Sequence, residues 1–170
     1  MHSKERTEEE WGTSVSDVAY ELRTAKHLLN SKVAHVPNCY IYSAQSGSYP
    51  VCRYAVQSEF MSAFNSGSQG SVSANNGVTN YRGTIDPYNI KRRWADANWL
   101  SGETDAETIL KGWIDELVAN GNGWQVWTRH NYGDSVEPTY ASALSNVIDY
   151  ALSKGVRIVT VERGLAEYVY

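Results

Sequence analysis

The chain has 170 residues, of which 42% are hydrophobic and 20% charged, and its formal net charge is −4. These values predict a globular chain with a buried core, exclude a disordered one, and argue against nucleic acid as a partner because no basic block occurs. No apolar run is long enough to span a membrane, and the charged start of the sequence predicts no signal peptide, so the localisation is left open.

The first predicted elements are a helix and a strand. Residues 16–30 carry apolar side chains at helical spacing, and Ser14 or Ser16 can cap the start of this helix. Residues 33–42 have the composition of a strand. Pro37 removes one hydrogen-bond donor from it and so favours a strand at a sheet edge or a bulge.

The middle of the chain has a less regular pattern. Residues 51–63 predict a second helix, and the Gly/Ser/Asn-rich stretch 65–82 predicts a long loop with at most one short strand. Residues 85–99 begin with a turn and fit either a brief strand or a loop. A further helix is then predicted over 106–120 from the spacing of its apolar residues.

The last third of the chain has the clearest order of elements. Residues 123–128 (GWQVWT) predict a short strand that leads into His130. A helix is predicted over 139–154 and ends at Gly155, and the β-branched run 156–161 (VRIVTV) predicts a strand buried on both faces. This order indicates an α/β fold with a parallel sheet or barrel, and it puts His130 at the carboxyl end of its strand, where such folds bind ligands.

Cysteines and aromatic residues constrain the chemistry. Cys39 and Cys52 lack the Cys-x-x-Cys spacing, and we expect both to be reduced. The chain has six Trp and twelve Tyr but two Phe. Rings with a polar edge favour surfaces that stack on sugars or contact proteins, although for any single ring a place in the core is equally expected.

A set of residues, mostly in the C-terminal half, matches a known family. It comprises Ile109, Trp113, Ile114 and Asp115, then GNGWQVWTRH (121–130) and SNVIDYALSKGVRIVTVERGLAEY (145–168), with weaker matches at His2-Ser3 and at VPNCYIYSAQSG (36–47). Together these segments resemble the polysaccharide deacetylase, or NodB-homology, family. The resemblance implies a partial or distorted (β/α) barrel with mostly parallel strands.

The same resemblance implies a function and a site. Members of this family remove N- or O-acetyl groups from carbohydrates, and a divalent metal, often zinc, polarises the acetyl carbonyl and activates a water. By the motif match, His130 corresponds to the catalytic acid and His2 to one metal ligand. We expect Trp127, Tyr42 and Trp99 to contact an acetylated glycan, such as a chitooligosaccharide or peptidoglycan.

The sequence departs from the family pattern at two motifs. The first motif, Thr-Phe-Asp-Asp-Gly, is absent, so we expect one domain over residues 1–170 that lacks the N-terminal strand or strands. The second histidine of the metal pair falls on Arg6, whose guanidinium has no lone pair for a cation. We therefore expect an inactive domain without a cofactor, whereas a complete homologue would hold a divalent metal such as zinc.

Three hypotheses about function follow from these departures. In the first, the missing strand and its metal-binding Asp lie upstream, and the protein is a deacetylase. In the second, the domain binds glycan or serves as a structural module without catalysis. In the third, another copy of the chain supplies the missing strand in a homo-oligomer, because an open sheet edge favours pairing.

Overall fold

The structure, a computed structural model, describes residues 14–33, 38–42, 50–66, 79–95, 106–128 and 137–170. The chain divides into two compact units, the first formed by Met1–Ser66 with Ile85–Lys91 and the second by Gly67–Thr84 with Arg92–Tyr170. Each unit is described by itself. The expected single domain over residues 1–170 stays a prediction.

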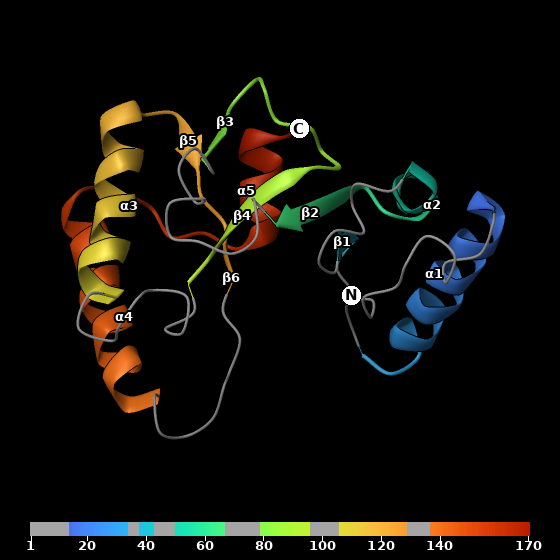
Figure 1. The fold of residues 1–170 in the computed structure, drawn as a ribbon, viewed down its shortest axis with the longest axis horizontal. Coiled ribbons are helices and arrows are strands. Elements are labelled where there is room, and N and C mark those ends of the chain that lie inside the picture. The colour runs from blue at the N-terminus through green and yellow to red at the C-terminus, as the bar shows by residue number, and fades with distance from the viewer. Residues whose placement is uncertain (1–13, 34–37, 43–49, 67–78, 96–105, 129–136) are drawn as a thin grey trace. The chain divides into compact units, whose positions relative to one another are not determined.

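The first unit combines two packed helices with a pair of parallel strands. Helix α1 (Val15–Asn30) packs against helix α2 (Pro50–Glu59), and strand β1 (Cys39–Ile41) pairs in parallel with strand β2 (Ser62–Ser66) (Figure 1). Helix α1 begins where predicted because the Ser14 hydroxyl accepts a hydrogen bond from the backbone N–H of Asp17 at 3.2 Å.

The core of the first unit is built from one face of each helix and from the strands. Tyr40 is fully buried in it, and its ring centroid lies 5.4 Å from those of both Tyr42 and Phe60. The buried members of this core are Val18, Ala19, Leu22, Tyr40, Tyr42, Cys52, Ala55, Val56, Phe60 and Ala63. Cys39 and Cys52 are free thiols, as expected.

The second unit contains a helix pair, a parallel strand pair and a small antiparallel ribbon. Helices α3 and α4 pack against each other, β4 pairs in parallel with β6, and β3 pairs antiparallel with β5. The bounds are β3 Asn80–Tyr81, β4 Ile90–Trp94, α3 Ala106–Asn120, β5 Gly123–Trp124, β6 Trp127–Thr128, α4 Glu137–Ser153 and α5 Val161–Tyr168. Strand β4 begins in the first unit and ends in the second.

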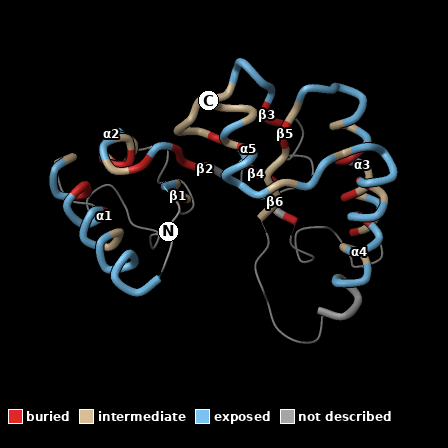
Figure 2. Tube along the Cα trace, turned by 180° about the vertical axis from the view of Figure 1, so that it is seen from behind, coloured by how far each residue is buried: buried red, intermediate tan, exposed pale blue. Residues whose placement is uncertain are grey.

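The core of the second unit lies between α3 and α4. Both helices have buried positions among exposed ones (Figure 2), and the buried residues of the two helices belong to one cluster. Its buried members are Ala95, Ala106, Leu110, Trp113, Ile114, Val147 and Ala151.

Part of the predicted fold is confirmed. The protein is an α/β chain with hydrogen-bonded strand order β1-β2-β4-β6, and parallel pairs at both ends of this order. The helices predicted over 16–30, 106–120 and 139–154 are present within two residues of the expected bounds. The last of these ends before Gly155, whose φ of +77° is the left-handed conformation that glycine tolerates. The more specific NodB-type barrel stays a prediction.

Three predicted elements differ from the structure in their bounds or their type. The helix expected over 51–63 ends at Glu59, and strand β2 follows from Ser62. The strand expected over 123–128 is divided into β5 and β6, which pair with different partners.

The third error concerns the run 156–161. Residues 156–160 have no strand or helix, and Ile158 is 59% exposed, so the β-branched run is not buried on both faces. Helix α5 begins at Val161 instead, because the Thr160 hydroxyl accepts a hydrogen bond from the backbone N–H of Arg163.

Candidate functional site

A turn after α3 aligns the strands that precede the predicted catalytic position. Gly121 and Asn122 have φ values of 58° and 49°, and this left-handed pair reverses the chain into β5. Gly123 then lies so close to β3 that a Cβ built on it would be 2.5 Å from the Thr79 methyl carbon. The close approach brings Thr79 next to the residues between β5 and β6.

The second unit has a cleft of about 570 Å³ beside these strands. Its wall is mostly aliphatic and comes from α3, α4 and residues 155–159, while its aromatic residues come from β5, β6 and α5. The main lining residues are Ile114, Leu117, Val118, Asn122, Trp124, Gln125, Trp127, Leu144, Val147, Ile148, Lys154, Val156, Arg157, Ile158 and Tyr168. A cavity of this size and lining is typical of small-molecule sites.

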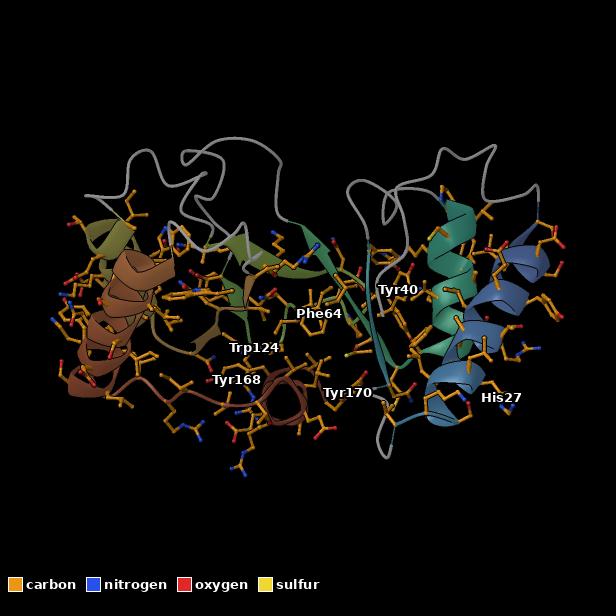
Figure 3. The ribbon with its side chains drawn as sticks, turned by 90° about the horizontal axis from the view of Figure 1, so that it is seen from below. His27, Tyr40, Phe64, Trp124, Tyr168 and Tyr170 are labelled. Atoms are coloured by element: carbon orange, nitrogen blue, oxygen red, sulfur yellow. The ribbon has the colours of Figure 1, made fainter. Side chains whose placement is uncertain are left out.

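Two aromatic pairs border the cleft. The rings of Trp124 and Tyr168 stack at 6.2 Å with an interplanar angle of 21°, and they lie next to each other in Figure 3. Trp127 meets Trp113 edge to face at 5.5 Å. Such rings can pack against the C–H face of a sugar and keep their polar edges for hydrogen bonds.

Gln125 lies between these aromatic pairs and forms three hydrogen bonds. Its side-chain oxygen accepts from the Trp127 indole N–H at 3.0 Å. Its amide nitrogen donates to the Thr79 hydroxyl at 3.1 Å and to the backbone carbonyl of Trp113 at 3.0 Å. The amide therefore joins β6, α3 and the segment before β3.

An ion pair between a buried arginine and a half-buried glutamate lies next to this amide. The Arg93 guanidinium is 1% exposed and donates to both oxygens of Glu116, at 2.8 and 2.7 Å. It also lies 4.9 Å from the centre of the Trp113 ring, within the range of a cation–π contact. The Thr79 hydroxyl donates to the same Glu116 carboxylate at 3.1 Å.

The neighbouring Arg92 is also buried, 4% exposed. Its Nη1 donates to the Thr128 hydroxyl at 3.3 Å, near the carboxyl end of β6. Burial lowers the pKa of the Arg92 guanidinium because it removes water from the charged form.

Charged residues at the edge of the cleft are paired with carboxylates. Lys154 lies 3.6 Å from an Asp115 oxygen, and its pKa is raised chiefly by a hydrogen bond to Tyr150. Arg157 and Arg163 both bind Glu167, and these hydrogen bonds lower the Glu167 pKa to about 2. The Arg157 pair joins the segment after Gly155 to α5.

The structure describes two of the five predicted site residues. Trp127 lines the cleft. Tyr42 belongs to the first unit, where its side chain is fully buried in the core and burial raises the pKa of its hydroxyl. His130, Trp99 and His2 lie outside the described residues. The assigned roles stay predictions.

Several cleft residues were not predicted from the sequence, namely Trp124, Gln125, Tyr168 and the adjacent Arg93. One signal was available for Gln125, because a single amide inside the apolar run GWQVWT needs hydrogen-bond partners if the run is buried. The run IKRRW similarly contains two arginines within a strand, and buried arginines need a counterion or acceptors.

The described ranges contain no group of three or more His, Cys, Asp or Glu side chains that could hold a metal ion. Among the helices described, none is long and apolar enough to cross a membrane. The expectations about zinc and about a homo-oligomer stay predictions.

Comparison of the chain with family models, with curated proteins and with solved structures finds no match. The resemblance to the NodB-homology family therefore stays a prediction from the residues quoted above.

Proposed function

We propose that the chain binds an acetylated glycan in the cleft of the second unit and does not deacetylate it. The observation that carries this proposal is the position of Trp127, which lines the cleft three residues before His130. The resemblance to carbohydrate deacetylases supplies the class of ligand, and the cleft supplies surfaces suited to it.

The chemistry of an acetylated sugar suits the lining of the cleft. The C–H face of a pyranose can stack on the Trp127 ring, and an acetyl methyl group can pack against aliphatic side chains such as Leu144 and Ile148. Hydroxyl and amide groups of the sugar can then bond to polar groups at the edge, which include Asn122 and Lys154.

The lack of catalysis is proposed from the sequence. Arg6 stands where the family resemblance puts the second metal-binding histidine, and a guanidinium does not coordinate a cation. The proposed protein therefore has a surface for the glycan but no complete metal site for deacetylation.

Calorimetric titration with N-acetylated chitotetraose tests the proposal. We expect wild-type binding and, for Trp127→Ala, an affinity about 30-fold or more lower, as for a central aromatic residue at a binding site. The control is Tyr54→Ala, which removes an aromatic ring that is 58% exposed on α2 and does not line the cleft. Equal affinities for wild type and Trp127→Ala would refute the proposed site.

A second candidate function, deacetylation, is favoured by one observation. Strand β6 runs parallel to β4 and ends at Thr128, so His130 follows a carboxyl end of the sheet. Acetate release from the same oligosaccharide, with added Zn²⁺ or Co²⁺, decides between the two. Metal-dependent release that disappears in His130→Ala would replace the binding proposal by the enzymatic one.

A further inference from the structure

We propose that Gln125 is a positioning residue that fixes the Trp127 indole in the cleft and thereby sets the affinity of the cleft for its ligand. The statement about affinity rests on the proposed function. The statement about the indole rests on hydrogen bonds within the second unit alone.

The amide of Gln125 has one chemically consistent orientation. An indole N–H is a donor only, so the group 3.0 Å from it must be the side-chain oxygen of Gln125. The backbone carbonyl of Trp113 is an acceptor only, so the group 3.0 Å from it must be the amide nitrogen. In the opposite orientation the amide nitrogen would face the Trp127 N–H, donor against donor. The amide oxygen would then face the Trp113 carbonyl, acceptor against acceptor.

Gln125 is in turn fixed by a chain of hydrogen bonds that ends in the ion pair of Arg93 and Glu116. The single hydroxyl proton of Thr79 goes to Glu116, which leaves a lone pair on the same oxygen for the Gln125 amide. Glu116 is fixed by its two bonds to Arg93. The polar atoms of Gln125 and Thr79 are therefore paired in one arrangement, and the amide cannot rotate without breaking several bonds.

This arrangement determines what Trp127 offers to a ligand. Its N–H is already bound to Gln125, and its ring meets the Trp113 ring edge to face. Trp127 therefore contributes ring surface to the cleft and no hydrogen bond. A ligand that stacks on this surface benefits from an indole that does not have to be ordered on binding.

The substitution Gln125→Leu tests the inference, because leucine has a similar size and removes all three hydrogen bonds. The indole N–H signal of Trp127, assigned with Trp127→Phe, is followed by ¹H–¹⁵N NMR and by exchange with D₂O. We expect the signal to shift and to exchange faster. Binding of N-acetylated chitotetraose should weaken about 2- to 13-fold, the ratio for one net hydrogen bond.

Two further variants keep the result interpretable. Gln57→Leu makes the same substitution on α2, outside the cleft, and should change neither the Trp127 signal nor the affinity. Thr79→Val removes one of the acceptors of the Gln125 amide and leaves the bond to Trp127, so it should give a smaller shift. If Gln125→Leu fails to fold, Thr79→Val still tests whether the hydrogen bonds of the Gln125 amide affect the Trp127 signal.

The outcomes separate this inference from the proposed function. An unchanged Trp127 signal in Gln125→Leu overturns the positioning role. A changed signal with unchanged affinity overturns the effect on binding. If the wild type binds no oligosaccharide, the proposed function fails, and the NMR experiment still decides the role of Gln125 at Trp127.

Discussion

Replacing Gly164 by alanine should test the packing of α5 against the cleft. A Cβ built on this buried glycine would lie 2.3, 2.4 and 2.8 Å from three atoms of the Trp124 ring. Real Cβ contacts are longer, so either the ring or the helix must move. The ring has little freedom because Trp124 is 8% exposed and stacks on Tyr168.

The expected magnitude combines two opposing effects. Alanine is favoured over glycine inside a helix by about 1 kcal/mol. Overpacking a filled core costs about 1–3 kcal/mol. Gly112 on α3 separates the two effects, since a Cβ there meets no atom within 4 Å. We therefore expect Gly112→Ala to stabilise the protein by about 1 kcal/mol, and Gly164→Ala to be about 1–3 kcal/mol less stable than Gly112→Ala.

Urea denaturation of the two variants and the wild type, followed by circular dichroism, measures this difference. In thermal unfolding, each kcal/mol corresponds to about 2–4 °C for a chain of this size. Equal stabilisation by Gly112→Ala and Gly164→Ala would refute the reasoning, because it would mean that α5 does not press on Trp124.

Two further predictions concern charged groups. Glu116→Leu leaves the Arg93 guanidinium, which is 1% exposed, without its counterion and should cost about 3–5 kcal/mol in urea denaturation. Glu107→Gln, at a pair in which both side chains are about one-third exposed, should have a much smaller effect. A loss below about 1 kcal/mol for Glu116→Leu would contradict the role of Glu116 as the counterion of a buried charge. The Glu167 pKa is lowered from 4.5 to about 2 by its two arginine partners, so its contribution to stability is present above pH 4.5 and is lost as the pH falls through 2. Melting temperatures across this range should fall for the wild type, and Glu167→Gln should lack this component of the fall; parallel curves would contradict it.

The sequence predicts best those elements whose signals are local. The helix after Ser14 has a cap and a regular apolar face, and Gly155 marks the end of α4 by its backbone conformation. These features depend on neighbours within one or two turns. They can therefore be predicted from the local sequence without knowledge of the rest of the fold.

The errors arise where the partners are distant in sequence. The run VRIVTV has the composition of a buried strand, but strand formation needs a paired neighbour, and residues 156–160 pair with no strand in the part of the chain that the structure describes. Thr160 supplies a local cap, and α5 forms in its place. In the same way, GWQVWT divides because Trp124 pairs with Asn80 whereas Trp127 pairs with Arg93.

The candidate site was only partly predictable for the same reason. Trp127 was expected to contact a glycan, and it lies in the segment GNGWQVWTRH that resembles the deacetylase family. The role of Gln125 depends on Thr79, which is 46 positions away along the chain, and no local pattern joins the two. Tyr42 was expected to contact a glycan, but it is found in the core of the first unit. A tyrosine ring suits a sugar-binding surface and a core equally well, so its residue type could not decide between them.

The segment between α4 and α5 has a consequence for the behaviour of the protein at high concentration. Residues 156–161 combine strong β-propensity with one charge and no proline, and Ile158 is largely exposed. Short segments of this kind promote amyloid-like stacking of identical chains. Arg157 carries the one charge of this segment. Its ion pair with Glu167 is lost when Glu167 is protonated, near pH 2. Because the arginine stays charged in acid, we expect this stretch to be where aggregation of the protein starts and the charge of Arg157 to oppose it.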